Sequence, residues 1–284
     1  MIGKYSIIVP AYNEEEAIDA VLKGLFASEL KEMIEVVVVD DCSSDKTGVI
    51  ASKYPITLLK NVQNFGYGYS LKRGIKTAKN DNIIIFDADG SYPVEALVTL
   101  VETYEKGFDM VVGERRGAHY RGSTVKSVAR FFFRLLSEFA TGRKIPDINS
   151  GCRVFRKDLA LNFFHTLSSG FSFTTTITLA FMLNAYSVVY APIQYNKRSG
   201  SSKVRYLRDT LRSGQIIIEA IVFYNPLKMF LLCAAAIIIA GALALLLAFV
   251  SKVAALLLFL TLSFAILIFS IGLMAILVKS SKTH

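Results

Sequence analysis

The sequence is poor in the residues that cross-link a fold or gather around a metal. It has only three cysteines, Cys42, Cys152 and Cys233, an odd number with no metal-type spacing. His119 and His165 also lie outside any recognisable ligand pattern. A disulfide framework is therefore not expected, and reduced thiols are typical of the cytosol.

Two long segments near the C-terminus lack charged side chains, namely Met229 to Val250 and Val253 to Val278. They raise the hydrophobic content to 53% and the mean hydropathy to +0.45, which is too apolar for an ordinary soluble enzyme. At about 1.5 Å per residue, each segment can cross a hydrocarbon core of roughly 30 Å as a helix. A buried hairpin of a soluble protein is the alternative, but its helices are usually shorter and carry a polar face. Because only Ser251 and Lys252 separate the segments, we expect a tight transmembrane hairpin.

Acidic residues are absent after residue 226, and the lysines there are unevenly placed. Lys228 precedes the hairpin and Lys279 and Lys282 follow it, whereas the intervening loop has only Lys252. The positive-inside rule therefore predicts both flanks in the cytoplasm. Residues 1 to 10 do not form a signal sequence, so the N-terminal domain is expected to stay cytoplasmic. The predicted location is the cytoplasmic (inner) membrane, with a multi-pass anchor and the N-terminal domain facing the cytoplasm.

The charge balance also limits the partners. The net charge is +9, and removing the four lysines after Pro226 leaves 28 basic against 23 acidic side chains, a surplus of five. Such a modest surplus suits anionic lipid headgroups and phosphates better than a nucleic-acid groove. We therefore expect membrane lipids, and no nucleic acid, among the partners.

The first 115 residues or so alternate between strand and helix patterns. Three apolar runs are typical of buried parallel strands. The first strand is expected at Tyr5 to Val9, the second at Glu35 to Val39 and the third at Ile83 to Phe86. Helical patterns cover Glu14 to Phe26, Asn64 to Ala78 and Pro93 to Lys106. This alternation predicts an α/β sheet with helices packed on it, which binds ligands beyond the carboxyl ends of its strands.

Two later segments, Val125 to Phe139 and Val204 to Phe223, combine an apolar stripe with regularly spaced basic residues. In the first, Lys126, Arg130 and Arg134 lie four residues apart on another face. Basic amphipathic helices beside membrane spans are expected in the headgroup layer. Core helices with a solvated basic face remain the alternative.

Asp87-Ala88-Asp89 directly follows the third apolar strand, where two carboxylates are costly unless a positive charge neutralises them. Mg²⁺ takes carboxylate oxygens together with substrate phosphates, so Asp89, helped by Asp87 and Ser91, is a candidate metal site bridging a diphosphate. An isolated Asp-x-Asp is also common as a turn or helix cap.

Two more polar motifs end the first two strands, Val9 to Glu14 and Val39 to Asp45. Together with Asp87 to Ser91 they resemble the nucleotide-sugar domain of family 2, GT-A type (Rossmann-like), inverting glycosyltransferases. The chain has no Gly-x-Gly-x-x-Gly after its first strand, since Asn64 to Gly68 contains only a Gly-x-Gly. This disfavours a nicotinamide-binding domain.

The resemblance implies roles for individual residues. Contacts to base and ribose are implied for Pro10, Tyr12, Glu14 and Asp40. Asp87 and Asp89 would face the ribose, the diphosphate and the metal, Mg²⁺ or Mn²⁺. Helix capping before Thr47 is the alternative for Asp40 and for Asp41.

Further along, Asp147 to Phe155 and Arg198 to Lys203 resemble later motifs of polyprenyl-phosphate sugar transferases of the dolichol-phosphate mannose synthase type, over about residues 5 to 230. Two positions depart from the family pattern. Ser91 replaces a frequent Gln, which leaves the third metal ligand open to water, and Cys152 replaces an aromatic residue. The absence of tryptophan excludes the Gln-x-x-Arg-Trp motif of processive relatives, so a chain-elongating polymerase is not expected.

The expected acceptor follows from the charges. A lipid phosphate is already anionic at neutral pH, so it needs cations to position it rather than a general base. Arg115, Lys126 and Arg130 are candidates for binding this phosphate, and Arg198 and Lys203 for closing over the donor phosphates. A mobile solvated loop is the alternative for the last two.

The aromatic and hydroxyl run from Gly170 to Thr176 has two open interpretations. It either lines the sugar or acceptor pocket or forms a buried strand or helix start, which β-branched threonines also suit.

The sequence thus predicts a GT-A domain with amphipathic interfacial helices and a two-helix membrane anchor. The expected parts are a cytoplasmic glycosyltransferase domain (1–200), an amphipathic juxtamembrane helix (201–225), and a transmembrane hairpin with a short cytoplasmic tail (226–284). The expected reaction moves a hexose with inversion from GDP-mannose, UDP-glucose or UDP-GlcNAc to dolichyl or undecaprenyl phosphate. A neutral lipid hydroxyl as acceptor, or a non-catalytic scaffold, remains as an alternative. The sugar, the base and the lipid length stay open, and a homo-oligomer is compatible with the sequence.

Overall fold

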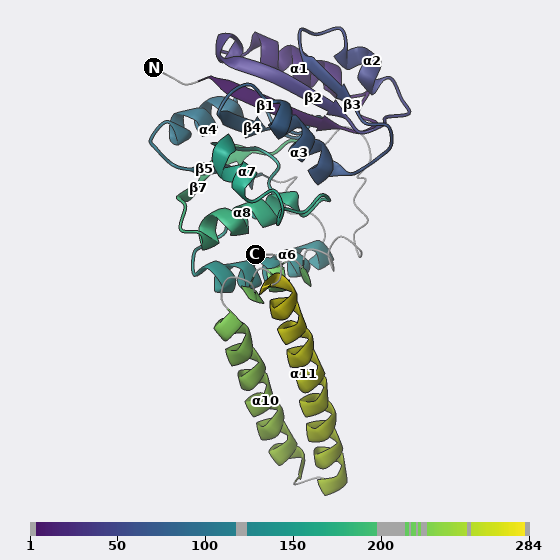
Figure 1. Ribbon diagram of the computed structural model, residues 1–284, viewed down its shortest axis with the longest axis vertical. Helices are drawn as coiled ribbons and strands as arrows, with labels where there is room; N and C mark the ends of the chain where they lie inside the picture. The colour runs from purple at the N-terminus through teal and green to yellow at the C-terminus, as the bar shows by residue number, and fades with distance from the viewer. Residues whose placement is uncertain are drawn as a thin grey trace. The chain divides into compact units, whose positions relative to one another are not determined.

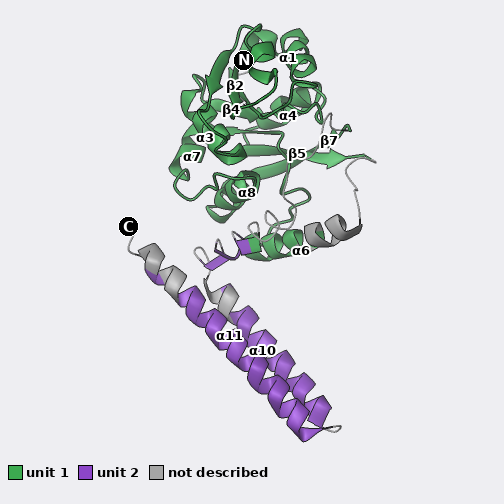
Figure 2. Ribbon diagram, turned by 90° about the vertical axis from the view of Figure 1, so that its right-hand side faces the viewer, with its two compact units in different colours: residues 1–214 green, residues 215–284 purple. Residues whose placement is uncertain are grey.

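The computed structural model describes residues 4–117, 124–197, 214–215, 217–219, 221–222, 226–248 and 251–281. The chain divides into two compact units, Met1–Gly214 and Gln215–His284 (Figure 2). Each unit is described by itself.

The first unit contains, among its described residues, a seven-stranded sheet in the order β3-β2-β1-β4-β6-β5-β7 (Figure 1). The strands are β1 Tyr5–Ala11, β2 Ile34–Asp40, β3 Thr57–Lys60, β4 Asn82–Ile85, β5 Met110–Arg116, β6 Arg153–Arg156 and β7 Val188–Gln194. All neighbouring pairs are parallel except those of β6, which runs antiparallel to both β4 and β5. The predicted α/β sheet is thereby confirmed, with one reversed strand.

Helices cover both faces of this sheet. The helices of this unit are α1 Ile18–Ala27, the 3-10 turn η1 Lys31–Met33, α2 Thr47–Ala51, α3 Tyr67–Thr77, α4 Ala96–Tyr104, α6 Thr124–Thr141, α7 Lys157–Asn162 and α8 Phe173–Leu183. Helix α6 packs on α8, beyond the layer that covers the sheet (Figure 1). Successive side chains of a strand point to opposite faces. Accordingly Ile7 and Val9 of β1 pack in a core with α1 and α4, whereas Ile8 packs in a second core with α3 and α8. The central strands are buried on both faces, which is why their sequences are continuously apolar.

Some boundaries differ from the expected ones. The run at Ile83 to Phe86 is β4, the fourth strand rather than the third, because the half-buried β3 has no apolar run that would reveal it. Helix α1 begins at Ile18 instead of Glu14, since the backbone N–H groups of Ala17 and Ile18 both donate to the Glu14 carbonyl and form a turn. The turn leaves Glu14 at the end of the sheet rather than inside a helix.

Helix α6 confirms the helix expected at Val125 to Phe139, and its side chains are described from Phe131 onward with the exception of residue 132. Phe131, Leu135 and Phe139, four residues apart, are 51%, 52% and 37% exposed. Ser137 and Ala140 on the other side are buried. An apolar stripe of the helix therefore faces away from the domain. The second amphipathic segment, Val204 to Phe223, lies largely outside the described residues.

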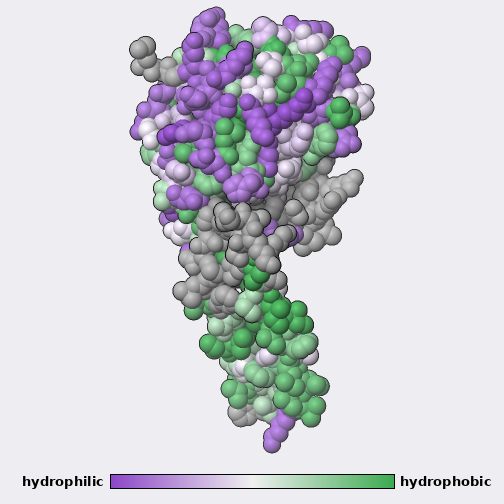
Figure 3. Space-filling model, in the orientation of Figure 1, coloured by the Kyte–Doolittle hydropathy of each residue, from purple (hydrophilic) through white to green (hydrophobic). Residues whose placement is uncertain are grey.

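Among its described residues, the second unit contains α10 Pro226–Ala248 and α11 Lys252–Ser281, two antiparallel helices that pack against each other, and short helical pieces between residues 215 and 222. Their spans Leu231–Ala248 and Lys252–Met274 have mean hydropathies of 2.8 and 2.7, and only 17% and 6% of their residues are buried. Figure 3 shows hydrophobic residues over the coloured surface of both helices. Because helices in the core of a soluble protein would be mostly buried, the described part of this unit fits a transmembrane hairpin instead.

Candidate donor-binding and catalytic site

The carboxyl ends of β1, β2 and β4 lie side by side in the sheet. In the register, Ala11 pairs with Asp40 at the ends of β1 and β2. The backbone N–H of Phe86, one residue past β4, donates to the Ile8 carbonyl. The loops that follow these strands, each predicted to bind the donor, therefore meet at one edge.

The loops after β1 and β2 are joined by hydrogen bonds into one structure. The backbone N–H of Asn13 donates to Ser43 Oγ at 3.0 Å, and that of Ser44 donates to Asn13 Oδ1 at 2.8 Å. The N–H of Glu14 donates to Thr47 Oγ1 at 2.8 Å. Asn13 adopts a φ of 53°, a left-handed conformation that asparagine tolerates better than most residues. Tyr12 and Glu14 are thus held next to the end of β2.

Asp40 is buried at the end of β2. Its Oδ1 accepts the backbone N–H of Ser43 at 2.9 Å. A Cβ on Gly48 would lie 2.6 Å from Asp40 Oδ2, so only glycine lets α2 pack this closely against the carboxylate. Asp40 is a fixed acceptor at the place where the base and ribose were expected.

The capping interpretation of Asp40 and Asp41 is wrong. Asp41 accepts hydrogen bonds from Asn61 Nδ2 at 2.6 Å and from the backbone N–H groups of Phe65 and Gly66 at 3.0 and 2.8 Å. It therefore ties β2 to the start of α3. Asp45, not either of the two predicted residues, accepts the Thr47 N–H at 2.9 Å.

Asp87 and Asp89 follow β4 on a turn in which Gly90 has a φ of 71°. Tyr67 donates its hydroxyl to Asp87 Oδ1 at 2.8 Å. Burial, together with the Asp87 carboxylate, raises the pKa of Tyr67 well above its ordinary value, so this hydroxyl keeps its proton. Asp89 is 7% exposed, and its Oδ1 accepts the N–H of Ser91 at 2.9 Å.

The donor set at this turn fits one hydrated Mg²⁺ or Mn²⁺. The described residues hold no group of three His, Cys, Asp or Glu side chains that could bind a metal unaided. Both cations, however, keep several waters and bind through one or two carboxylates plus substrate phosphates. Ser91 Oγ is buried and has no hydrogen-bond partner among the described residues, so it is a third hard oxygen whose bonding capacity is unused.

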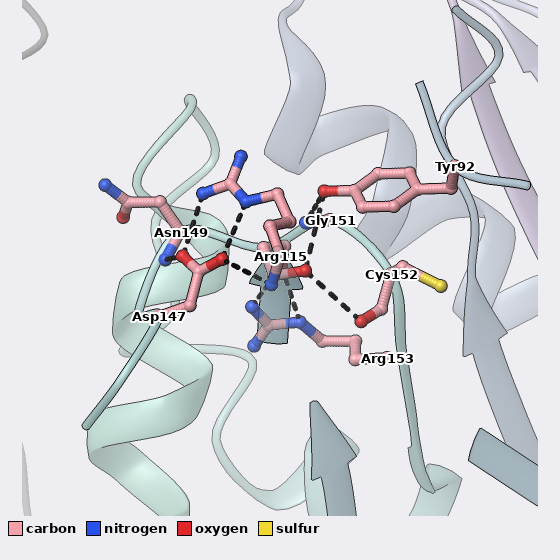
Figure 4. Close-up of polar contacts among 8 residues, drawn as sticks. Tyr92, Arg115, Asp147, Asn149, Gly151, Cys152 and Arg153 are labelled. Atoms are coloured by element: carbon pink, nitrogen blue, oxygen red, sulfur yellow. Dashed lines mark hydrogen bonds and ion pairs between the residues drawn. The ribbon is translucent and has the colours of Figure 1, made fainter. Parts of the chain in front are cut away.

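Arg115 on β5, predicted to bind the acceptor phosphate, forms a two-pronged ion pair with Asp147 (Figure 4). The Nε–Oδ2 and Nη2–Oδ1 distances are 2.7 and 2.8 Å, and the side chains are only 15% and 2% exposed. The guanidinium also lies 5.3 Å from the ring centre of Tyr195. The structure thus gives Arg115 a partner within the chain, and its role toward the acceptor stays a prediction.

Three residues of the site were not assigned a role from the sequence. Tyr92 accepts the backbone N–H of Gly151 at 2.8 Å (Figure 4). Arg153, fully buried at the start of β6, donates to the Ser150 carbonyl, to the Thr174 carbonyl at 3.0 Å and to Thr178 Oγ1 at 2.9 Å. Burial lowers the pKa of Arg153. The third is Tyr67. It belongs to the Asn64 to Gly68 motif, whose pattern disfavours a nicotinamide-binding domain but gave Tyr67 no role of its own.

Cys152, the departure from the family pattern, is fully buried. Burial, and then the nearby Asp87 charge, raise the pKa of its thiol, so no reactive thiolate is expected there. The residue fills space between the site and the core.

The run from Gly170 to Thr176 forms the start of a helix, since α8 begins at Phe173 and its first threonines are buried. Thr175 Oγ1 donates to Asn149 Oδ1 at 2.8 Å, which attaches α8 to the loop before β6. Whether the run also lines a pocket stays a prediction.

Arg198 and Lys203 lie outside the described residues, as do the side chains of Lys126 and Arg130 on α6. The described chain just before Arg198 is nevertheless bound to the site. The N–H of Asn196 donates to the Ser91 carbonyl at 2.8 Å, and that of Tyr195 to the Arg116 carbonyl at 3.0 Å. The chain that leads to Arg198 is therefore attached to the turn that contains Asp89, through the hydrogen bond between Asn196 and Ser91.

In open α/β sheets ligands bind beyond the carboxyl ends of the strands, which is where Asp40, Asp87 and Asp89 lie. The family model for glycosyl transferase family 2 matches residues 6–164, more than half of the chain. The protein belongs to glycosyl transferase family 2, and its fold is of the GT-A type.

Several curated relatives are sugar transferases named for lipid phosphates. The chain is 35% identical over 167 residues to an undecaprenyl-phosphate 4-deoxy-4-formamido-L-arabinose transferase of Photorhabdus laumondii, covering 56% of this chain and 50% of that protein. It is 32% identical to a dolichol-phosphate mannosyltransferase of Pyrococcus furiosus, covering 55% and 47%. A dolichyl-phosphate hexose transferase of Haloferax volcanii is 27% identical, covering 76% and 92%. The matches thus span about half the length of the first and second relatives and most of the third.

Solved structures share the fold. A glucosyl-3-phosphoglycerate synthase of Mycobacterium tuberculosis, in complex with Mn²⁺, UDP-glucose and phosphoglyceric acid, has a TM-score of 0.62 at 17% identity, covering 77% of this chain and 80% of that one. A mannosyl-3-phosphoglycerate synthase of Rubrobacter xylanophilus has a TM-score of 0.58 at 18% identity, covering 77% and 72%. At such identities the likeness concerns the fold alone.

Proposed function

We propose that the protein transfers a hexose from a nucleoside diphosphate sugar to a polyprenyl phosphate, with inversion at the anomeric carbon. The donor would be GDP-mannose, UDP-glucose or UDP-GlcNAc, and the acceptor dolichyl or undecaprenyl phosphate. Support comes from the family, from relatives named for undecaprenyl and dolichyl phosphates, and from two helices long enough to reach a lipid acceptor in its membrane.

On the donor side, the joined loops after β1 and β2 bind the nucleoside. Pro10 and Tyr12 flank the base, and Glu14 and Asp40 accept hydrogen bonds from base and ribose. Asp40 suits this role because it is already held by the Ser43 N–H and need not reorganise on binding. These assignments predict a site that is largely formed before the donor arrives.

Asp87, Asp89 and Ser91 would hold one Mg²⁺ or Mn²⁺ at the donor site. When bound, the cation neutralises charge that develops on the departing diphosphate. The M. tuberculosis structure, which shares the fold, holds Mn²⁺ together with UDP-glucose, and this agrees with a divalent cation beside the donor. The turn that carries the two carboxylates is tied to the chain that leads to Arg198, because the Asn196 N–H donates to the Ser91 carbonyl.

The acceptor phosphate needs positive charge near the anomeric carbon. Lys126 and Arg130 would bind it, while Arg198 and Lys203 close over the donor phosphates. Arg115, whose charge is shared with Asp147, would also bind the acceptor phosphate and at the same time hold the loop before β6 in place.

The reaction balances without a general base. A phosphate oxygen of the lipid attacks the anomeric carbon, a carbon–oxygen bond forms, and the bond from that carbon to the donor diphosphate breaks with its electron pair leaving on the nucleoside diphosphate. No proton must be removed because the lipid phosphate is anionic at neutral pH. The product is a polyprenyl-phosphate hexose.

The predicted domains keep their boundaries in this proposal. Residues 1–200 form the cytoplasmic transferase, residues 201–225 an amphipathic helix at the membrane surface, and residues 226–284 the anchor. The lysine distribution around the hairpin supports the cytoplasmic orientation.

The observation that carries the proposal is the pair Asp87 and Asp89 at the end of β4, beside the loops of β1 and β2. Transfer of labelled sugar from each of the three donors to undecaprenyl and dolichyl phosphate, with Mg²⁺ or Mn²⁺, tests it. We expect an acid-labile lipid product from one donor and at least a 100-fold lower rate for Asp89→Asn, because a charge that binds the metal is removed. Asp81→Asn, an exposed aspartate before the same strand, is the matched control and should leave the rate unchanged.

No transfer from any donor would contradict the proposal. An alkali-stable glycolipid would instead identify a neutral hydroxyl as acceptor, and full activity of Asp89→Asn would show that the metal carboxylate is dispensable.

A further inference from the structure

Tyr67, the first residue of α3, is aimed at the Asp87 carboxylate. Its hydroxyl donates to Asp87 Oδ1 at 2.8 Å, and its side chain is largely enclosed by protein. The two residues are 20 positions apart and come from different elements, so the contact depends on the packing of α3 against the end of β4. None of the roles proposed above uses this hydroxyl.

The Tyr67 ring is fixed on its other side by the loop before α8. It stacks on Phe171, with ring centres 5.9 Å apart and an interplanar angle of 9°. The next residue, Gly68, packs so closely on this loop that a Cβ would lie 2.5 Å from the Ser168 carbonyl oxygen. The N–H of Tyr69 donates to the Ser169 carbonyl at 2.8 Å. Because backbone and ring are both held, the hydroxyl has little freedom to leave Asp87.

Gly151 also packs against the same carboxylate. A Cβ at this position would overlap both carboxylate oxygens of Asp87, so the carboxylate lies directly against the glycine backbone. Gly151 is itself fixed, because its N–H donates to the Tyr92 hydroxyl at 2.8 Å. The Asp87 carboxylate is therefore confined between a tyrosine hydroxyl and a glycine.

We propose that Tyr67 is a positioning residue that orients Asp87 toward the metal and the donor diphosphate. The inference rests on the proposed function, since it assumes that Asp87 acts at the metal–diphosphate site. The hydrogen bond from the Tyr67 hydroxyl, together with the contact to Gly151, restricts rotation of the carboxylate and so fixes the direction in which it faces. Hydrogen-bond partners of metal-binding carboxylates typically change metal affinity or activity by about 10–100-fold when removed.

The test compares Tyr67→Phe with the wild type as full-length protein in detergent. The substitution removes the hydroxyl and keeps the ring that stacks on Phe171. Titration of Mn²⁺ at fixed GDP or UDP should give a dissociation constant about ten-fold higher than that of the wild type. In transfer assays the rate should recover at high Mn²⁺, because the metal site is misaligned rather than lost.

Tyr104→Phe is the matched control. The Tyr104 hydroxyl donates to Asn82 Oδ1 at 3.0 Å, at the amino end of β4, whereas Tyr67 acts at its carboxyl end. Both substitutions remove a hydrogen bond that a tyrosine hydroxyl donates. The acceptor is at the amino end of β4 for Tyr104 and just past its carboxyl end for Tyr67. Only Tyr67→Phe should change the Mn²⁺ dependence.

Equal Mn²⁺ affinity of Tyr67→Phe and wild type would overturn the inference while leaving the proposed function intact. An equal loss in Tyr104→Phe would also overturn it, because the effect would then reflect general destabilisation. If the wild type binds neither nucleotide with Mn²⁺, the proposed function fails first and the inference fails with it.

Discussion

Arginine residues near the site differ in how their charge is balanced. Arg115 shares its charge with Asp147 in a pair largely shielded from water, whereas Arg153 is fully buried against carbonyl and hydroxyl oxygens. Both hold the segment from Asp147 to Arg153, whose Gly151 lies against Asp87. The position of the Asp87 carboxylate thus depends on Arg115, which is largely shielded, and on Arg153, which is fully buried. Both can do this without contact to a substrate.

Asp147→Asn should lower stability by about 2–4 kcal/mol, because it leaves the Arg115 guanidinium buried without a counter-charge. For a unit of this size that corresponds to a melting temperature lower by about 5–10 °C. Thermal unfolding of the detergent-solubilised protein, followed by circular dichroism, measures the change.

The control is the exposed pair Arg156–Asp158, whose side chains are 51% and 58% exposed. Asp158→Asn should cost about 0–1 kcal/mol, since solvent screens such a pair. Equal shifts for the two variants would mean that the buried pair contributes no more than a surface one.

The sequence allowed some of these residues to be predicted and not others, for a physical reason. Asp87 and Asp89 were predictable because acidic side chains directly after an apolar strand are conspicuous on their own. Tyr67, Tyr92 and Arg153 each act through a partner far along the chain, 20, 59 and 25 positions away. Such contacts depend on tertiary packing, which the local pattern does not contain.

Among the strands, those that are buried on both faces and have a long apolar run could be predicted from the sequence. β1, β2 and β4 are enclosed by helices on both faces, so their apolar runs identify them directly. β3 is only half buried, and β6 has four residues with an arginine at each end. Helix α6 was expected from its period, but its outward-facing stripe of Phe131, Leu135 and Phe139 became evident only from the fold.

Leu135→Trp should place a fluorophore in the lipid headgroup layer if α6 lies at the membrane surface. The chain has no tryptophan, so a single introduced one reports its own surroundings. In liposomes with anionic lipids, brominated acyl chains should quench this tryptophan strongly, because apolar faces of interfacial helices sink to the acyl boundary.

Val49→Trp on α2 is the matched variant, since Val49 is a similarly exposed aliphatic residue at 61%. Its fluorescence should not respond to brominated lipid. If both tryptophans stay unquenched, α6 is a solvated helix of the transferase domain and the core-helix alternative gains support.

For the whole molecule, the orientation of the hairpin in the membrane decides which side the transferase domain faces. The hairpin is almost uniformly apolar, so its own surface provides no preference for either orientation. The lysines do, because Lys228 near the start of α10, Lys279 near the end of α11 and Lys282 after it belong to one end of the hairpin. Only Lys252, the first residue of α11, lies at the other end. The proposed reaction requires the site at Asp89 to face the same side as these flanks.

Cysteine labelling of intact cells of an expression host tests this orientation. In a Cys42→Ser background, we expect Ser251→Cys to react with a membrane-impermeant maleimide, and Ser281→Cys to react only after lysis. The two positions stand at opposite ends of α11, a helix of 30 residues, so in the proposed topology they lie on opposite sides of the bilayer. Cys42, which is exposed in the wild type, should follow Ser281→Cys because it belongs to the transferase domain. Labelling of Cys42 in intact cells would place the donor loops outside and would rule out the cytoplasmic reaction, whatever the hairpin does.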